Sequence, residues 1–213
     1  MLRFMKIFDR SLWGITLFTL TYLIGGIAVS LAKTNWEFLF YVTVLIVIVV
    51  AVVTIHSRIR FTQGVLWCLS LWGLFHLLGG LLPVPASWPV ETDRYVLYNV
   101  WVFPWLKFDQ LLHGYGFAVA TWACYQALRA LLPAATPRFG LLLICVFAGM
   151  GLGAFNEVME FTVTLFLHEN NVGGYENTGW DLVSNMVGSV AAALLIHYGS
   201  PAEIRRPPRP AIV

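Results

Sequence analysis

Charged residues are scarce in this chain. Only 11% of its 213 residues are Asp, Glu, Lys or Arg, whereas 59% are hydrophobic. A typical soluble domain carries roughly 25% charged and about 45–50% apolar residues. The composition therefore excludes a soluble globular domain and a disordered chain, and it indicates a multi-pass membrane protein. The mild net charge of +2 also argues against a nucleic-acid-binding protein.

Cysteines and short catalytic motifs are scarce as well. The three cysteines, Cys68, Cys124 and Cys145, lie in apolar runs and form no CxxC pair. A disulfide framework or a zinc ribbon is therefore not expected. The sequence also lacks HExxH, GxSxG, Walker and GxGxxG motifs, so no short motif marks a catalytic class.

Long apolar runs are what the sequence does have, and a membrane span needs about 20 largely apolar residues. We predict an all-α polytopic membrane protein, a six-transmembrane-helix bundle that forms a single domain over residues 1–204. The predicted spans cover residues 12–32, 38–55, 61–82, 108–132, 139–167 and 181–198. Residues 205–213, which include the run RRPPRP, are expected to form a disordered cytoplasmic tail.

The basic residues predict the orientation, because Lys and Arg favour cytoplasmic loops. With six spans, most of them fall on one side, which places both termini in the cytoplasm. This set comprises Arg3, Lys6, Arg10, Arg58, Arg60, Arg129, Arg138, Arg205, Arg206 and Arg209. On the opposite side, the Trp- and Tyr-rich loop 83–107 is expected to be interfacial and partly helical, with a lid as one candidate role. The loop 168–180 is expected to be polar and turn-rich.

Charged residues inside the predicted spans give the strongest functional signal, because they are costly in a bilayer and usually serve a function. Asp109 and His113 lie one turn apart at the start of the fourth span. Glu157 and Glu160 share one face of the fifth span.

Further polar residues belong to the same ends of their helices. Asp181 and Asn185 open the predicted sixth span, and His76 lies near the outer end of the third. The topology therefore places all these side chains toward the extracytoplasmic side, where we expect them to form one shared site.

Four carboxylates gathered in a poorly hydrated place repel one another strongly, so either some are protonated or a cation lies among them. Carboxylates and histidine are ordinary ligands of zinc and manganese, and a carboxylate-rich set also suits magnesium. We therefore expect a divalent metal ion as cofactor. The expected ligands are Asp109, His113, Glu157, Glu160, Asp181 and His76.

Simpler explanations exist for several of these residues. Asp109 and Asp181 could serve only as helix N-caps, since each opens a predicted helix. Glu157 and Glu160 could form structural hydrogen bonds, and His76 could be a packing residue.

The motifs themselves resemble those of a known family. The set FDQLLH (108–113), FNEVMEF (155–161) and GYENTGWDLVSNMVG (174–188) resembles the YjdF-type inner-membrane proteins of bacteria, whose function is unknown. The pattern D-x3-H, E-x2-acid and D-x3-N-x2-G is also similar to the VanZ-like family, which is linked to glycopeptide resistance at the cell envelope. The resemblance implies a multi-pass protein of the bacterial cytoplasmic (inner) membrane, and it implies a site rather than a reaction.

Three functions are compatible with the sequence. The first is a metal-dependent hydrolase or transferase acting on a lipid or lipid-linked envelope substrate reached from the bilayer. In this hypothesis Glu157, Glu160 and His113 are catalytic, with Glu160 as the general base. Asn156, Asn185 and Trp180 are expected to contact the substrate.

The other two hypotheses need no reaction. A proton- or cation-coupled transporter could use the same carboxylates. No internal repeat and no polar lining is expected in its cytoplasmic half, which weighs against transport. A structural or assembly subunit would use the cluster only to tie the helices together. Membrane lipids are the expected partners in every case.

Overall fold

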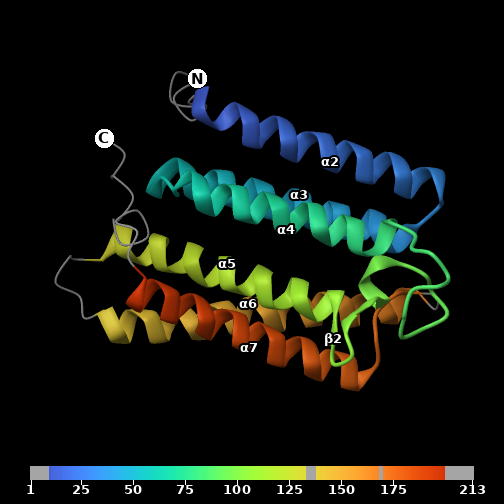
Figure 1. The fold of residues 1–213 in the computed structure, drawn as a ribbon. Coiled ribbons are helices and arrows are strands. Elements are labelled where there is room, and N and C mark those ends of the chain that lie inside the picture. Colours follow the sequence, from blue (N-terminus) through green and yellow to red (C-terminus); the bar gives the residue numbers. More distant parts are fainter. Residues whose placement is uncertain (1–9, 133–137, 168–169, 200–213) are drawn as a thin grey trace.

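The computed structural model describes residues 10–132, 138–167 and 170–199. A short 3-10 helix, η1 (Arg10–Leu12), comes first, and six α-helices follow among these residues (Figure 1). They are α2 (Trp13–Ala32), α3 (Trp36–Ile59), α4 (Gln63–Leu81), α5 (Phe108–Leu131), α6 (Arg138–Phe166) and α7 (Tyr175–Tyr198). The prediction of an all-α fold is confirmed. The predicted tail 205–213, Arg3 and Lys6 lie outside the described residues.

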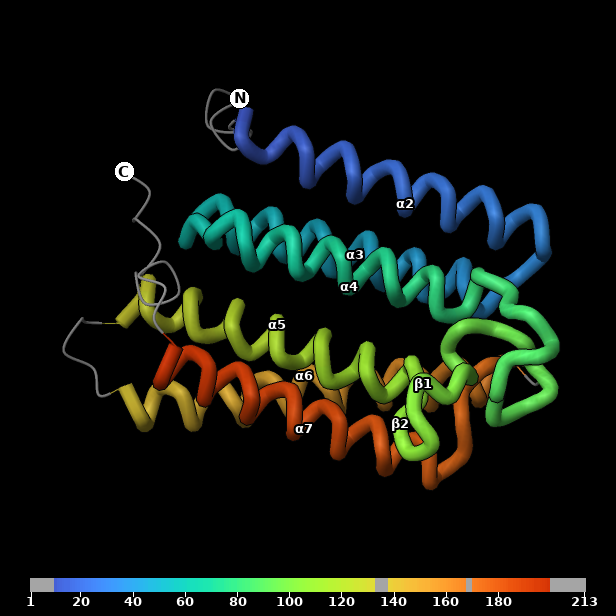
Figure 2. The backbone as a smooth tube through the Cα atoms, in the orientation of Figure 1, coloured from blue at the N-terminus to red at the C-terminus, as the bar shows by residue number. Residues whose placement is uncertain are grey.

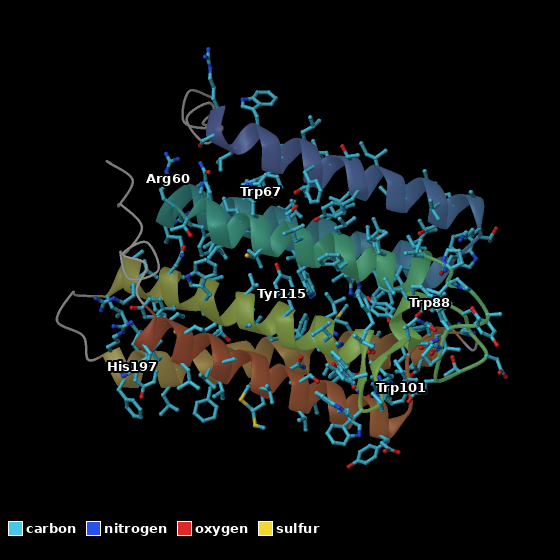
Figure 3. The ribbon with its side chains drawn as sticks, viewed as in Figure 1. Arg60, Trp67, Trp88, Trp101, Tyr115 and His197 are labelled. Atoms are coloured by element: carbon cyan, nitrogen blue, oxygen red, sulfur yellow. The ribbon has the colours of Figure 1, made fainter. Side chains whose placement is uncertain are left out.

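The helices run side by side along one axis and form two groups of three, which the tube in Figure 2 makes clear. α2, α3 and α4 form one group, and α5, α6 and α7 form the other, with α4 packed against α5 at the boundary. We call the end at which α2 begins and α7 ends the terminal end. We call the opposite end, which carries the connection from α4 to α5, the loop end. Arg60 and His197 lie at the terminal end, and Trp88 and Trp101 lie at the loop end (Figure 3).

Five of these helices are long and apolar enough to cross a membrane: α2 together with η1, α3, α4, α6 and α7. Their outward faces carry large exposed apolar side chains such as Leu17, Val47 and Phe147. α5 has the length but not the apolar composition. It lies among α4, α6 and α7, and its polar side chains Gln110, His113 and Gln126 are buried there. A helix surrounded by other helices presents little surface to lipid, so α5 needs fewer apolar residues.

Two helices extend beyond their predicted bounds. α3 covers Trp36–Ile59 rather than 38–55, because the Asn35 side chain accepts the N–H of Phe38 at 3.0 Å and caps the helix earlier. α7 begins at Tyr175 rather than at 181, although the Asn- and Gly-rich composition of this segment is typical of a loop. Its first turn contains Glu176, whose charge suits a helix N-terminus.

The connection 83–107 contains less helix than strand and irregular chain. Its only helical element is the 3-10 turn η2 (Leu97–Asn99), and it also forms a short antiparallel hairpin of β1 (Trp101–Phe103) and β2 (Leu106–Lys107). Isolated bridges join Pro83 to Val96 and Val90 to Val100. Prolines along the segment lack the N–H that a helix needs, so the chain folds back on itself at the loop end instead.

The group of α5, α6 and α7 is held by close helix contact. A Cβ atom at Gly188 would overlap the backbone carbonyl of Gly114, and one at Gly153 would overlap the side chain of Asn185. Small residues allow such an approach between membrane helices. In the group of α2, α3 and α4, glycines meet large side chains rather than backbone, as Gly80 meets Phe38 and Gly73 meets Tyr22. The main cluster of this group comprises Leu23, Phe38, Tyr41, Val42, Leu45 and Leu77, together with Val163 of α6.

Candidate functional site

Side chains from α5, α6 and α7 meet at the loop end of the bundle. Asp109, His113 and Asp181 each offer a ligand atom within 4.8 Å of the other two, and the same holds for His113, Glu157 and Glu160. His113 belongs to both groups and therefore lies at their centre. We call these five residues the acidic cluster. The structure thus brings together all the charged residues that the sequence pointed to on these three helices.

The two ring nitrogens of His113 face different neighbours. Nδ1 lies 3.1 Å from Oδ1 of Asn185 and 3.5 Å from Oε1 of Glu157. Nε2 lies 3.7 Å from Oδ1 of Asp109 and 3.9 Å from Oε1 of Glu160. Asn185 Oδ1 and the carboxylate oxygens are acceptors, so Nδ1 donates its proton to Asn185.

This hydrogen bond determines what Nε2 can do. In the neutral imidazole, a proton on Nδ1 leaves a lone pair on Nε2, and that lone pair faces Asp109 and Glu160. Two carboxylates and a lone pair repel one another unless a cation lies between them. The alternative is a protonated ring that donates from both nitrogens. An Nδ1 that donates to a fixed acceptor while Nε2 faces the site is the usual arrangement of a metal-binding histidine.

Several buried polar atoms in and beside the acidic cluster lack a hydrogen-bond partner among the described residues. They are both carboxylate oxygens of Glu157, Oδ1 of Asp181 and Nδ2 of Asn185. Glu157 is only 8% exposed and Asp181 is fully buried. An unpaired buried carboxylate is costly, so a proton, a water molecule or a cation is needed to complete the site.

One side of the acidic cluster does have a countercharge. Lys107, which precedes α5, is buried, and its Nζ lies 2.5 Å from Oε2 of Glu91. The same ammonium donates to Oδ1 of Asn177. The amide of Asn177 in turn donates to Oδ2 of Asp181 at 2.5 Å. This chain of contacts stabilises one oxygen of Asp181 and leaves the other directed to the cluster without a partner.

A small cavity adjoins the acidic cluster on the side of α4. Its volume is about 10 Å³, which is roughly the space that one water molecule needs. Polar groups of His76, Tyr98, Asp109, His113 and Asn156 line it, together with Trp72 and other apolar side chains. The cavity can therefore hold a water molecule or a bare ion, but no organic substrate.

His76 takes part in the cavity wall rather than in either group of candidate ligands. The hydroxyl of Tyr98 lies 2.6 Å from Nδ1 of His76 and donates to its carbonyl oxygen at 2.9 Å. Burial raises the pKa of Tyr98 well above its ordinary value, so the phenol stays protonated. Asn156, also in the cavity wall, donates to Oε1 of Glu160 at 2.9 Å and orients that carboxylate.

Two connections close the site at the loop end. The amide of Asn99 donates to Oγ1 of Thr92 and reaches Oδ1 of Asn171 at 3.3 Å, which joins the α4–α5 connection to the α6–α7 connection. Both carboxylate oxygens of Glu37 accept the N–H of Asn171, at 2.9 and 3.0 Å. The start of α3 is thereby tied to the cover of the acidic cluster.

The remaining predicted residues take other positions. The Trp180 side chain is 54% exposed and lies on the outer face of α7. Asp181 lies within α7, so the N-cap explanation for it is wrong. The N-cap of α5 is Lys107, and Asp109 lies in the first turn.

Lys107, Asn177 and Tyr98 are parts of the site that the sequence does not predict. Asn177 lies one helical turn before Asp181, but this spacing is informative only once α7 is known to begin at Tyr175. Lys107 adjoins the FDQLLH motif. Tyr98 carried no sequence signal, because it reaches His76 through a long connection.

The described residues suit a divalent cation. The donors are one imidazole nitrogen and carboxylate oxygens, a set that zinc and manganese accept, and magnesium accepts the oxygens. His113, Glu157 and Glu160 form one candidate ligand set, and Asp109 with Asp181 offers a second set around the same histidine. The unpartnered oxygens of Glu157 and Asp181 are the atoms that such an ion would satisfy.

The comparison with known proteins places the chain in a family. No curated protein and no solved structure matches it significantly. A family of predicted membrane proteins, DUF2238, matches over residues 11–200. This range contains all six α-helices and every residue of the acidic cluster. The chain is therefore an integral membrane protein and belongs to the DUF2238 family of predicted membrane proteins.

Proposed function

We propose that this chain is a six-span protein of the bacterial cytoplasmic membrane that binds a divalent metal ion in the acidic cluster. With that ion it acts as a hydrolase or transferase on a lipid or lipid-linked envelope substrate. The observation that carries the proposal is the set of buried, unpartnered carboxylate oxygens around His113. Protons on the carboxylates or on His113 are the alternative to a metal ion, and the metal content of the purified protein distinguishes the two.

Several features support six spans and an extracytoplasmic site. α5 runs the length of the bundle beside the five apolar helices (Figure 1), so it crosses the membrane with them. Arg10, Arg58, Arg60, Arg129 and Arg138 flank helix ends at the terminal end. The positive-inside rule then places the terminal end in the cytoplasm and the acidic cluster on the opposite side. The likeness of the motifs to YjdF-type and VanZ-like proteins agrees with a site at the cell envelope.

The residues of the cluster provide the parts of a hydrolytic site. A bound divalent ion would supply an activated water molecule and polarise the bond to be broken. Glu160 is oriented at 2.9 Å by Asn156, which lines the cavity, so it can accept the proton of that water as general base. His113 is fixed by Asn185 and keeps Nε2 directed at Asp109 and Glu160.

Aromatic side chains at the loop end favour a lipid-like substrate. Trp88, Phe103 and Trp105 are 46%, 52% and 73% exposed, and Trp180 is 54% exposed. Such residues locate at the membrane–water interface, where the polar part of a lipid lies. The cavity is too small for a substrate, so its reacting group can enter only if the connection 83–107 moves away from α4. Tyr98 is the residue that this movement would withdraw from His76.

Elemental analysis of the protein purified in a mild detergent tests the metal site. The wild type should carry close to one zinc or manganese per chain, or take up one on addition. The double variant Glu157→Gln/Glu160→Gln should lose it. Glu176→Gln is the matched control, because Glu176 is an exposed carboxylate in the first turn of α7. An equal metal content in the wild type and in the double variant would refute the proposed site.

The reaction itself needs a second assay. Metal-loaded protein in vesicles is incubated with radiolabelled phospholipids and polyprenyl-linked sugar precursors, and the products are separated by chromatography. Turnover that needs Glu160 and stops on chelation supports the enzyme. A stoichiometric metal with no turnover of any lipid would retain the metal site and contradict the enzymatic function.

Transport coupled to a proton or cation is the second candidate, and one observation favours it. The sequence predicts no polar residues in the half of the bundle toward the terminal end, but the structure buries Thr121, Gln126 and Ser189 there. Gln126 exchanges hydrogen bonds with Thr62, and Ser189 and Thr121 bond the carbonyl of Phe117. These groups continue from the acidic cluster along α5. A pH-driven flux in proteoliposomes that Glu157→Gln and Gln126→Leu both abolish would establish transport.

A further inference from the structure

An apolar groove runs between α2, α3 and α4, the group of helices that contributes no residue to the acidic cluster. Its volume is about 300 Å³, the size at which ligand cavities in proteins begin (roughly 300–1,000 Å³). Its walls are aliphatic, with side chains such as Ile15, Val49 and Leu69. The hydroxyls of Thr19 and Ser70 also line it, but they bond one another at 2.6 Å. The groove therefore offers an apolar ligand a surface without unsatisfied polar groups at its centre.

The length of the groove corresponds to one leaflet of a bilayer. Along α2 its lining extends from Leu12 to Tyr22, a rise of about 15 Å at 1.5 Å per residue. The hydrocarbon core of a bilayer is about 30 Å thick, so a leaflet contributes about half of that. Tyr22, Trp72 and Gly73 line the end toward the middle of the bundle. One extended acyl chain fits this length.

Arginines adjoin the lining residues of the groove at the terminal end of the bundle. Arg10 lies two residues before the groove residue Leu12, and Arg58 and Arg60 follow the groove residue His56. None of these arginines forms an ion pair with a carboxylate of the residues that the structure describes. The groove residue His56 is only 7% exposed, and its Nδ1 has no hydrogen-bond partner among the described residues. Figure 3 shows Arg60 at this end of the bundle.

We propose that the groove binds one acyl chain of an anionic phospholipid, with the phosphate of the lipid at Arg10 and Arg60. The aliphatic walls of the groove contact the acyl chain. The length of the groove, which matches one leaflet, determines how much of the acyl chain is bound. The arginines recognise the head group, since a guanidinium binds phosphate through two parallel hydrogen bonds. This lipid lies in the leaflet at the terminal end, so it is distinct from any substrate of the acidic cluster.

Native mass spectrometry tests the proposal on the full chain released from vesicles of equal phosphatidylglycerol and phosphatidylcholine. One phosphatidylglycerol should remain bound per chain, with at least a fivefold preference over phosphatidylcholine. Val49→Trp, which places an indole in the groove, should reduce the bound lipid at least tenfold. Val47→Trp is the matched control, because Val47 lies on the same helix, is 63% exposed and does not line the groove. Equal retention in the two variants would overturn the proposal.

The head-group assignment has its own variant. Arg10→Gln/Arg60→Gln should abolish the preference for phosphatidylglycerol while an acyl chain is still retained. A preference that survives this double change, or a wild type that retains phosphatidylcholine equally, would overturn the assignment of an anionic lipid.

A measurement on the wild type removes any dependence on the folding of variants. Phosphatidylglycerol with a photoreactive diazirine on its acyl chain is crosslinked in vesicles, and the labelled peptides are identified. Labels should concentrate on the groove faces of α2 and α3, with Thr16, Leu45 and Val49 among the labelled residues. Labels spread evenly over the exposed faces of all the helices would show that no chain is bound specifically.

Discussion

The half of the bundle formed by α2, α3 and α4 and the half formed by α5, α6 and α7 achieve helix packing by different means. In the first half, large side chains such as Phe38, Tyr41 and Leu45 fill the contacts and leave an apolar groove. In the second half, Gly188 meets the backbone of Gly114 and Gly153 meets Asn185. The second half also buries His113, Glu157 and Asp181, whereas the first half buries Glu37 and His56 at opposite ends of α3.

The difference in helix packing between the two halves follows from the properties of lipid as a solvent. Lipid chains are as apolar as Leu, so burial of apolar surface drives helix association far less in a bilayer than in water. Charged groups, by contrast, must be kept from lipid. Close contact through glycine excludes lipid from the acidic cluster, while the aliphatic half can leave a groove that lipid fills. The tightest packing is therefore expected around the functional site.

The largest predicted effect comes from breaking the close contact in the second half. Gly188→Ala would place a methyl group on the carbonyl of Gly114, where backbone must move. We expect a loss of at least about 3 kcal/mol of unfolding free energy, or roughly 6–12 °C in the midpoint of thermal unfolding in detergent. The matched change Gly151→Ala, on α6 with nothing within 4 Å, should leave the midpoint unchanged or raise it, because Ala favours helix. Equal midpoints for the two variants would contradict the packing difference.

A metal ion should stabilise the folded protein through the acidic cluster of the second half and through no residue of the first half. At a concentration of 100 times the dissociation constant, a ligand that binds only the folded state adds about 2.7 kcal/mol. Zinc or manganese should therefore raise the unfolding midpoint of the wild type, and a chelator should reverse the rise. His113→Ala should abolish this response, and His197→Ala, at the far end of α7, should retain it. A rise of the same size in His113→Ala would show that the ion binds elsewhere.

A smaller loss of unfolding free energy is expected from a change at the contact between the α4–α5 connection and α4. Tyr98→Phe removes the hydroxyl that bonds His76 at 2.6 Å. The loss of one partner of a buried pair costs about 1–2 kcal/mol. Hydrogen exchange of the connection should also become faster. Tyr95→Phe is the control, since Tyr95 is 42% exposed. An equal loss of unfolding free energy in Tyr95→Phe would show that the effect of Tyr98→Phe does not come from the hydrogen bond to His76.

The smallest effect should come from the buried hydroxyl pair in the groove. Ser70→Ala removes the bond to Thr19 at 2.6 Å. Hydrogen bonds between membrane helices contribute about 0.6 kcal/mol on average. The unfolding free energy in detergent should fall by about that amount, without any change in metal content. A loss greater than about 2 kcal/mol on the same scale would show that the first half also depends on polar contacts.

The amino-acid sequence is sufficient to predict the helices and the members of the acidic cluster. Apolar runs locate the helices to within a few residues in most cases, and charged residues in those runs can be tolerated only where they meet one another. Hence Asp109, His113, Glu157, Glu160 and Asp181 can be named from the sequence alone. Membrane burial makes such residues conspicuous.

The parts that could not be predicted depend on long-range contacts. The start of α7 is stabilised by the bond from Asn177 to Asp181, and Asn177 in turn accepts from Lys107, which lies 70 positions earlier. The connection 83–107 takes its shape from contacts with α4 and with Asn171. Local composition contains none of this information. The Gly and Asn residues before Asp181 therefore predict a loop, whereas the helix α7 already begins at Tyr175.

The composition of α5 has a consequence for how the chain enters the membrane during synthesis. Polar and charged residues in a nascent segment oppose its release from the translocon into lipid, and about 2.5–3.5 kcal/mol for Asp or Arg at the centre is the upper end of this cost. α5 carries Asp109, Gln110, His113, Gln126 and Arg129, and by length and composition it does not qualify as a span. If α5 spans the membrane as proposed, we expect it to need α4 before it or α6 and α7 after it as a partner at the moment of integration. Biogenesis would then be cooperative across the helices that later enclose the acidic cluster.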